Sequence, residues 1–471
     1  MKSNHPRRLT LCSVTLAALL LALTPPCLAQ TGRATRLLDA LAQTGAQVGL
    51  QVIDLADGRR LVSRNAATLL VPASTLKIFT AAAALRGLGP RFRWRTRLLI
   101  EPDGTLVLQG TGDPTLTAAG LRHLAEAAPL SGGALVIDDG STETPLYPPG
   151  WAWDDLSTDY APPLSNLGVN GNLATVTVQA AAVPGAPARV ATDPDLGLPV
   201  TSTALTGQSD AETSVDWTRP LDGRALTVYG VVPMGCTVEG AVPVMDGSEY
   251  AARIFIRALR ERGLPPPSSV RHGRATSVAR PVGEVESPPL GEGVTIMLKQ
   301  SDNYVAEQIL RALGLPDGDR TATGLKQTAA LLQTLGVKTG TFRQVDGSGL
   351  SRMNLVCPAQ VVAVLCAMAS DAMFVRALPI AAVDGTLAHR FACSPLRGRL
   401  RAKTGTMTGI SALSGYVCDE KGRPRYAFSM MVNGHLQPSA TIKHLEEEIL
   451  EALFAEPPPA KHQAPDQFWV W

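Results

Sequence analysis

The stretch Val71-Pro72-Ala73-Ser74-Thr75-Leu76-Lys77-Ile78-Phe79-Thr80 decides how this chain is interpreted. Pro72 disfavours helix before it, and the residues that follow are good helix formers, so a helix is expected to begin here. In that helix Ser74 and Lys77 share one face, close to the N-terminus, where free N–H groups favour negative charge. A desolvated lysine near other cations could act as the base that a serine nucleophile needs. Alone, the pattern more often marks a capping serine and a solvated lysine.

Two later motifs change this interpretation. Ser301-Asp302-Asn303 lies between two predicted helices, and Lys403-Thr404-Gly405 lies in a predicted strand. Together with Ser-x-x-Lys, these tripeptides form the set used by penicillin-binding proteins and class A β-lactamases. A specified tripeptide occurs by chance in a chain of this length on the order of 0.05 times, so the ordered trio is a specific signal.

A second Lys-Thr-Gly occurs at Lys338-Thr339-Gly340. It follows a predicted helix and leads into a loop, whereas the motif must lie on a strand that lines the cleft. Lys403 continues an alternating pattern, with Arg399 and Arg401 on its own face, and precedes two apolar strands. We therefore assign the motif to Lys403 and interpret Lys338 as a lysine at a helix end.

Length and composition indicate an ordinary globular protein. The chain has 471 residues, of which 45% are hydrophobic and 18% charged, enough for two or three domains. The five cysteines beyond residue 29 are odd in number and too widely spaced for a metal site, and two of them, Cys357 and Cys366, lie in an apolar helical segment. We expect no cofactor, and we expect core thiols rather than a disulfide framework.

The N-terminus has the features of an export signal. A basic head with Lys2 and Arg7 precedes the apolar run 9–23, and Cys27-Leu28-Ala29 resembles a cleavage site, which gives a mature chain from Gln30. The run is short for a membrane span, which needs roughly 20 residues. A lipoprotein anchor at Cys27 is the alternative, although the preceding prolines fit it poorly.

Removal of residues 1–29 takes away three basic and no acidic residues, which leaves 40 basic against 41 acidic residues. This balance gives no indication of nucleic-acid binding. No later segment is apolar enough to be a transmembrane anchor. We expect a periplasmic protein.

The order of predicted elements indicates a split domain. A hairpin at 50–62 precedes the helix that carries Ser74, and helices and three strands return after residue 290. Residues 91–290 between them contain many short β-like runs broken by Gly, Pro and Asp. The Pro-rich tail 456–471 ends in aromatic residues with no assigned role.

On these motifs, the chain resembles the low-molecular-mass class C penicillin-binding proteins, the D-alanyl-D-alanine carboxypeptidase/endopeptidase family S13 of penicillin-binding protein 4 type. The resemblance covers nearly the whole mature chain, and further matching segments are Gly110 to Thr117, Trp151 to Asp155, Asp346 to Arg352 and Asp384 to Leu387. The 227 residues from Ser74 to Ser301 agree with that family, whereas β-lactamases have a far shorter gap.

The resemblance implies an α/β (α+β) fold. Its serine acyltransferase domain, an antiparallel sheet flanked by helices, is split by two inserted β-rich domains. The implied boundaries are 30–90 and 286–455 for the peptidase domain, 91–115 and 176–285 for the second domain, and 116–175 for the third.

The resemblance also implies roles for the motif residues. Ser74 would form an acyl-enzyme with a D-Ala-D-Ala-type substrate, and Lys77 would be its base. Ser301 would relay a proton toward the leaving amine, and Asn303 would hold Lys77 and the substrate amide. Asp302 is expected to have a structural role in its turn rather than a catalytic one.

The Lys-Thr-Gly segment would bind the substrate. Lys403 and Thr404, the first two residues of the motif that ends at Gly405, would bind the terminal carboxylate. The backbone N–H groups of Ser74 and Thr406 would form the oxyanion hole.

Three more residues fall near motifs that resemble the family's contacts to diaminopimelate. Asp155, Tyr160 and Arg352 would meet its zwitterionic end, and loop salt bridges are the alternative interpretation. The expected partners are peptidoglycan stem peptides and, as covalent inhibitors, β-lactam antibiotics. A homodimer is left open.

Two rival functions could use the same scaffold. A β-lactamase of class A deacylates with a glutamate past Ser-Asp-Asn, but no glutamate occurs between Glu307 and Glu420. An inactive wall-binding scaffold would not need the intact trio. We therefore expect a penicillin-sensitive D,D-carboxypeptidase with D,D-endopeptidase activity.

Overall fold

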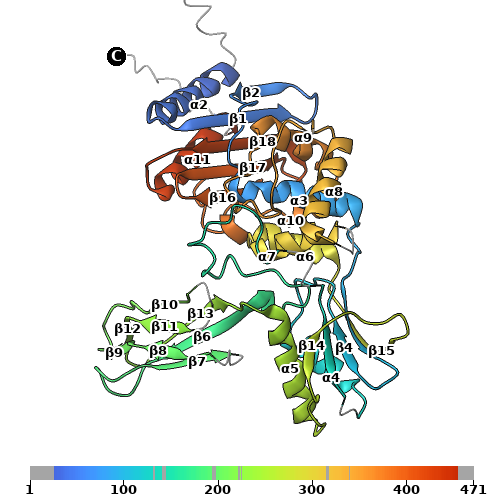
Figure 1. The fold of residues 1–471 in the computed structure, drawn as a ribbon. Helices are drawn as coiled ribbons and strands as arrows, with labels where there is room; N and C mark the ends of the chain where they lie inside the picture. Colours follow the sequence, from blue (N-terminus) through green and yellow to red (C-terminus); the bar gives the residue numbers. More distant parts are fainter. Residues whose placement is uncertain are drawn as a thin grey trace, which may run out of the picture.

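The computed structural model describes residues 26–454 except 131–132, 141–144, 194–197, 221–222, 224, 315–317 and 339. It has a mixed α/β fold with a body of helices around one sheet and a long insertion that forms two further lobes (Figure 1). Residues 1–25, which make up most of the expected signal segment 1–29, and residues 455–471, which include the expected tail 456–471, lie outside the described residues. In the described part of the chain, no helix combines the length and apolar character needed to cross a membrane.

The sheet of the body joins the two ends of the described chain. Its strand order is β16-β17-β18-β1-β2, and every neighbouring pair is antiparallel. The register of β1 on β18 runs from Gln47 opposite Asn433 to Asp54 opposite Tyr426. The strands are β1 (Gln47–Asp54), β2 (Arg60–Arg64), β16 (Leu400–Met407), β17 (Ile410–Cys418) and β18 (Pro424–Asn433).

Helices cover both faces of this sheet because its strands alternate two apolar faces. On β17, Tyr416 packs into a core with α3, α6, α7, α9 and α10, whereas its neighbour Val417 packs into a second core with α2 and α11. The helices of the body are α2 (Pro26–Gln43), α3 (Lys77–Gly87), α6 (Leu290–Lys299), α7 (Asn303–Ala312), α8 (Arg320–Thr334), α9 (Pro358–Met368), α10 (Ala372–Ala377) and α11 (Ser439–Phe454), with 3₁₀ turns η1 (Ala73–Leu76) and η3 (Gly385–Leu387).

The insertion forms two lobes below the body in Figure 1. One lobe is a mixed sheet of order β14-β5-β4-β3-β15 with α4 and α5, and the other contains β6 to β13 in three small sheets. The first lobe comprises β3 (Arg95–Ile100), β4 (Leu106–Gln109), α4 (Ala118–Glu126), β5 (Leu135–Asp138), α5 (Gly247–Glu261), β14 (Val270–His272) and β15 (Arg280–Glu286). The second comprises η2 (Asn170–Asn172), β6 (Leu173–Gln179), β7 (Arg189–Asp193), β8 (Val200–Ser202), β9 (Leu205–Gly207), β10 (Asp216–Thr218), β11 (Leu226–Tyr229), β12 (Val231–Pro233) and β13 (Thr237–Pro243).

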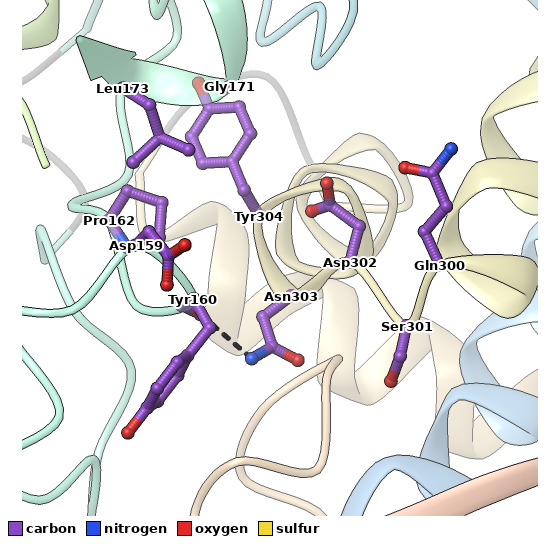
Figure 2. A pocket seen from close by; sticks show the side chains of 10 residues that line it. All are labelled: Asp159, Tyr160, Pro162, Gly171, Leu173, Gln300, Ser301, Asp302, Asn303 and Tyr304. Atoms are coloured by element: carbon purple, nitrogen blue, oxygen red, sulfur yellow. Dashed lines mark hydrogen bonds between the residues drawn. The ribbon is translucent and has the colours of Figure 1, made fainter. Parts of the chain in front are cut away.

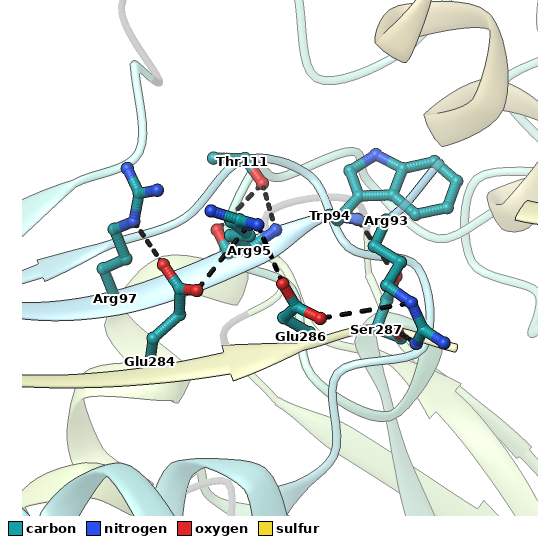
Figure 3. Close-up of polar contacts among 8 residues, drawn as sticks. All are labelled: Arg93, Trp94, Arg95, Arg97, Thr111, Glu284, Glu286 and Ser287. Atoms are coloured by element: carbon teal, nitrogen blue, oxygen red, sulfur yellow. Dashed lines mark hydrogen bonds and ion pairs between the residues drawn. The ribbon is translucent and has the colours of Figure 1, made fainter. Parts of the chain in front are cut away.

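The chain leaves the body at Trp94 and re-enters it at Ser287, and these two segments are hydrogen-bonded to each other. Trp94 N donates to Ser287 Oγ at 3.0 Å, and Ser287 N donates to Trp94 O at 3.0 Å. Beside them β3 and β15 carry alternating charges, with Arg97 2.6 Å from Glu284 and Arg95 Nη2 2.9 Å from Glu286 (Figure 3). These pairs are half-exposed and each contributes little, but the strand pairing itself keeps the two crossings together.

The strand pairing divides the insertion differently from the boundaries expected from the sequence. The expected third domain, 116–175, contains β5, but β5 pairs with β4 and β14, which were expected in the second domain. The segment 118–138 therefore shares a sheet with 95–109. We propose that the lobe of β3, β4, β5, β14 and β15 and the lobe of β6 to β13 are the two inserted units.

Candidate active site

Ser74 lies in the turn η1, immediately before Lys77 opens α3. The turn is stabilised by two hydrogen bonds that Thr75 donates to Pro72 O, one from its backbone N–H at 3.3 Å and one from its hydroxyl at 2.7 Å. Ala73 has a φ of 47°, an uncommon value for a residue with a side chain. The chain thus enters the helix through a tight bend that presents Ser74 at the cleft.

Two glycines let other segments approach this bend closely. A Cβ on Gly405 would lie 2.8 Å from Pro72 O and 3.1 Å from Ser74 N, which is too close for any side chain there. A Cβ on Gly349, whose φ is 83°, would lie 2.0 Å from Ala73 O. Strand β16 and the loop around Gly349 therefore hold the serine turn between them.

Lys77 is completely buried, and its ammonium group makes three hydrogen bonds. Its Nζ lies 2.9 Å from Ser74 Oγ, 2.6 Å from Asn303 Oδ1 and 2.8 Å from Ser348 O. Burial lowers the pKa of Lys77 to about 8, against the opposing effect of nearby carboxylates. A neutral amine is therefore accessible near neutral pH, at hydrogen-bonding distance from the serine hydroxyl.

Lys403 forms a second buried pair on the facing strand. Its Nζ lies 2.9 Å from Ser301 Oγ and 2.8 Å from Thr404 O. Burial, and then the charge of Lys77, hold the pKa of Lys403 well below its usual range. Ser301 has a φ of 64° in the short link between α6 and α7, so its backbone is held in a disfavoured conformation beside the cleft.

Asn303 connects the body to the insertion. Its Oδ1 accepts from Lys77, while its Nδ2 donates to Tyr160 O at 2.9 Å. Figure 2 shows this amide directed at the backbone of Tyr160, across a cavity of about 220 Å³. Asp302 caps α7 by accepting from Val305 N at 2.9 Å, which confirms the expected structural role of that carboxylate.

Two buried carboxylates, Glu307 and Asp346, act on the charge of Lys77, and neither was assigned a role at the site from the sequence. Glu307 accepts from Gly347 N and Ser348 N, so it holds the loop whose carbonyl binds Lys77. Asp346 accepts from Gly349 N at 2.8 Å and Ser351 N at 2.7 Å. Burial, and secondarily the charge of Asp346, raise the pKa of Glu307 to about 8. A single glutamate within a helix gives no spacing signal that could have marked it.

The cleft extends from Ser74 toward Asp155, Tyr160 and Arg352 as a cavity of about 1040 Å³. The Tyr160 hydroxyl donates to Asp155 Oδ1 at 2.8 Å, and the Arg352 guanidinium donates to Thr408 O at 3.1 Å. An acid and a cation therefore line one cavity without forming a hydrogen bond to each other.

The structure brings the predicted site residues together around this cleft. Ser74, Ser301, Asn303 and Thr406 line it, and the buried Lys77 and Lys403 contact lining residues. Lys338, the lysine of the second Lys-Thr-Gly, is exposed after α8. A nucleophile, a desolvated amine and a second cation in one cleft are the components of serine acyl transfer.

Comparison with known proteins supports the same conclusion. The chain is 32% identical to a D-alanyl-D-alanine carboxypeptidase of Actinomadura sp. (strain R39), over 91% of this chain and 85% of that protein. It is 28% identical to the D-alanyl-D-alanine carboxypeptidase DacB of Haemophilus influenzae, over 83% of this chain and 86% of that protein.

The fold agrees with a solved structure of this kind. The crystal structure of penicillin binding protein 4 from Haemophilus influenzae matches 88% of this chain and 99% of its own, with a TM-score of 0.76 at 26% identity. The expected fold class is thereby confirmed, including the insertion in the serine domain. The family model described as D-Ala-D-Ala carboxypeptidase 3 (S13) matches residues 34–451. The chain belongs to the D-Ala-D-Ala carboxypeptidase 3 (S13) family.

Proposed function

We propose that this chain is a penicillin-sensitive D,D-carboxypeptidase and D,D-endopeptidase that cleaves peptidoglycan stem peptides through a serine acyl-enzyme. The observation that carries the proposal is the fully buried Lys77 amine 2.9 Å from Ser74 Oγ. Membership of the S13 family supports the reaction class.

Acylation begins with proton transfer from Ser74 to the neutral amine of Lys77. Ser74 Oγ attacks the carbonyl carbon of the penultimate D-alanine, and the oxyanion is bound by the N–H groups of Ser74 and Thr406. Each such donor contributes roughly 3 kcal/mol. When the C–N bond breaks, the leaving amine takes a proton through Ser301, which lies 2.9 Å from the ammonium of Lys403. Water then hydrolyses the ester and restores Ser74.

The two ends of the substrate occupy opposite arms of the cleft. The carboxylate next to the leaving amine binds at Thr404, in the positive field of Lys403. The side chain of the stem residue, for which we propose diaminopimelate, extends into the cavity of Asp155 and Arg352. Its free ammonium and carboxylate match that acid and that cation.

β-Lactam antibiotics act on this site as covalent inhibitors under the same proposal. The Haemophilus influenzae protein has also been solved in complex with a β-lactam, with a TM-score of 0.71 to this chain. We further propose export to the periplasm, which rests on the basic and apolar segments of residues 1–29.

Covalent labelling with a fluorescent penicillin tests the proposal. The wild-type protein is expected to carry one label per chain, and Ser74→Ala none, while Ser63→Ala, at an exposed serine of the edge strand β2, labels normally. Absence of label, or label that survives Ser74→Ala, would refute the acyl-serine mechanism. Rapid turnover of nitrocefin without stable label would favour a β-lactamase instead.

Digests of isolated peptidoglycan separate the two cleavage activities. Mass spectrometry is expected to show loss of terminal D-alanine from monomers and conversion of cross-linked dimers into monomers. If neither product forms while penicillin labels Ser74, the proposed substrate class is wrong.

A further inference from the structure

A second cavity shares Ser74, Ser301 and Thr406 with the main cleft, but neither Asp155 nor Arg352 lines it. It has a volume of about 240 Å³, and Thr386, Thr404, Arg390 and Lys443 line it. The Thr404 hydroxyl lies 2.8 Å from the Thr386 hydroxyl, so the proposed carboxylate site forms the near wall of this cavity. Residues of η3, β16 and α11 together form its boundary.

The position of the cavity determines which half of a substrate could enter it. Under the proposed function, on which this inference rests, the acyl half lies toward Asp155, and the leaving amine lies beside Thr404. Any part of the leaving fragment beyond its carboxylate therefore extends into this second cavity. A leaving D-alanine has only a methyl group to place there, so the carboxypeptidase reaction leaves most of the cavity unused.

One of the two cations in the wall is already neutralised. Arg390 Nε lies 2.7 Å from Glu447 and Arg390 Nη2 lies 3.1 Å from the fully buried Glu446. Arg390 Nη2 also donates to Lys443 O at 2.8 Å, which fixes this turn of α11 against η3 and the loop after it. Arg390 is thus a structural element of the wall.

The other cation is available to a ligand. Within the part of the chain that the structure describes, no carboxylate lies within ion-pairing distance of Lys443 Nζ. The residue is half-buried at the cavity, and its neighbour His444 is directed to Glu448 instead. Lys443 therefore presents an ammonium that forms no ion pair with any described residue at the wall of this cavity, although its charge opposes the rise that burial causes in the pKa of Glu446.

We propose that this cavity is the subsite for the leaving strand of a cross-linked substrate and that Lys443 binds a carboxylate of that strand. In cross-link cleavage the same amide C–N bond breaks and the same proton reaches the amine, but the leaving fragment is a whole diaminopimelate-containing stem. This fragment carries carboxylates besides the one next to the amine. Lys443 is accordingly a specificity residue that favours the endopeptidase reaction over the carboxypeptidase reaction.

Charge reversal at Lys443 tests the proposal in the full-length protein. kcat/KM is measured on a pentapeptide monomer and on a D-Ala–diaminopimelate cross-linked dimer. Lys443→Glu is expected to lower the ratio of dimer to pentapeptide kcat/KM by about tenfold, mainly through the KM of the dimer, because a repulsive contact replaces an attractive one. Lys443→Arg keeps the charge and is expected to keep the ratio within about twofold.

Controls make each outcome decisive. Lys421→Glu makes the same charge change at the exposed turn between β17 and β18, and it is expected to leave the ratio unchanged. Fluorescent penicillin labelling of Lys443→Glu shows whether the variant has folded. The proposed subsite is overturned if the ratio of dimer to pentapeptide kcat/KM is unchanged in folded Lys443→Glu. It is also overturned if Lys421→Glu lowers that ratio as much as Lys443→Glu does. A wild-type protein that is labelled and cleaves pentapeptide but not dimer overturns the subsite and the endopeptidase part of the proposed function, and leaves the acyl-serine mechanism and the carboxypeptidase part intact. One that is neither labelled nor active overturns the proposed function as a whole.

Discussion

At the scale of single residues, burial determines the chemistry of Lys77. Its pKa of about 8 leaves the amine neutral in about a tenth of molecules at pH 7. Because only the neutral amine can accept the proton of Ser74, the rate of acylation is expected to rise about tenfold per pH unit below 8 and to level off above it. Second-order rates of penicillin labelling from pH 5.5 to 9.5 measure this, and a rate that is flat across pH 8 contradicts the base role.

The two buried lysines are expected to respond differently to substitution by arginine. Arginine stays charged at all relevant pH values, so Lys77→Arg should lower the acylation rate by at least about 10³-fold. Lys403→Arg keeps the positive field and should cost about tenfold, mostly through weaker binding of the carboxylate. Labelling rates of both folded variants provide the comparison, and equal losses would mean that Lys77 serves only as a positive charge.

The sequence predicted these residues only where a motif marks them. Ser74, Ser301 and Lys403 could be selected because three short patterns occur in a known order. Glu307 and Lys443 lie on helices that contain other charged residues, in no spacing that marks a site, and a charge on a helix is usually solvated. Only the packing of distant segments brings them to the cleft, so no local pattern could have identified them.

At the scale of elements, the contact between η1 and β16 depends on Gly405. Gly405→Ala would place a Cβ 2.8 Å from a backbone oxygen and 3.0 Å from Ala73 Cβ, neither of which can move as a flexible side chain would. We expect a loss of stability of about 1–3 kcal/mol and an acylation rate lower by about 100-fold. Thermal unfolding and penicillin labelling measure the two effects.

Gly293 offers a matched control for that substitution. A Cβ there would meet only Ile309 Cδ1 at 3.9 Å, inside helix α6. Gly293→Ala should therefore leave labelling unchanged and stabilise the fold by up to about 1 kcal/mol. If Gly405→Ala and Gly293→Ala give the same thermal unfolding and the same labelling rate, the close approach at Gly405 does not hold Ser74 in place.

Most elements of the body could be predicted because their patterns are long. The strand β16 continues an alternating pattern, and β17 and β18 are long apolar runs. The hairpin expected at 50–62 is observed as β1–β2, from Gln47 to Arg64. The three-residue strands β8, β9 and β10 are too short to show any period. They form only because neighbouring strands pair with them.

At the scale of the whole molecule, the insertion is part of the active site. Trp151, which belongs to it, is buried and donates its indole N–H to Asp346 Oδ2 at 3.2 Å. Trp151→Phe removes that donor from a buried carboxylate, so we expect a loss of about 2 kcal/mol and slower penicillin labelling by several-fold. Trp153→Phe is the control, since Trp153 is 74% exposed. Equal behaviour of the two variants in thermal unfolding and labelling would exclude a role for this contact.

Local sequence patterns could not predict which strands pair when they lie far apart in the chain. The alternation in Gln47–Asp54 predicts a strand but not its partner, and that partner, Pro424–Asn433, lies near the other end of the chain. The division of the insertion also depends on pairing, because β5 and β4 join across the helix α4. The split of the body was inferred from the order of the motifs, and the fold of a related protein confirms it.

The close approach at Gly405 also limits how this protein could escape an antibiotic. Resistance at a penicillin target requires a change that excludes the drug but still admits the peptide. Any side chain at Gly405 meets Pro72 and Ser74 themselves rather than the ligand, so it disturbs the nucleophile for both compounds at once. Selection for resistance is therefore expected to act on the outer cleft, where drug and stem peptide differ, and to leave this position unchanged.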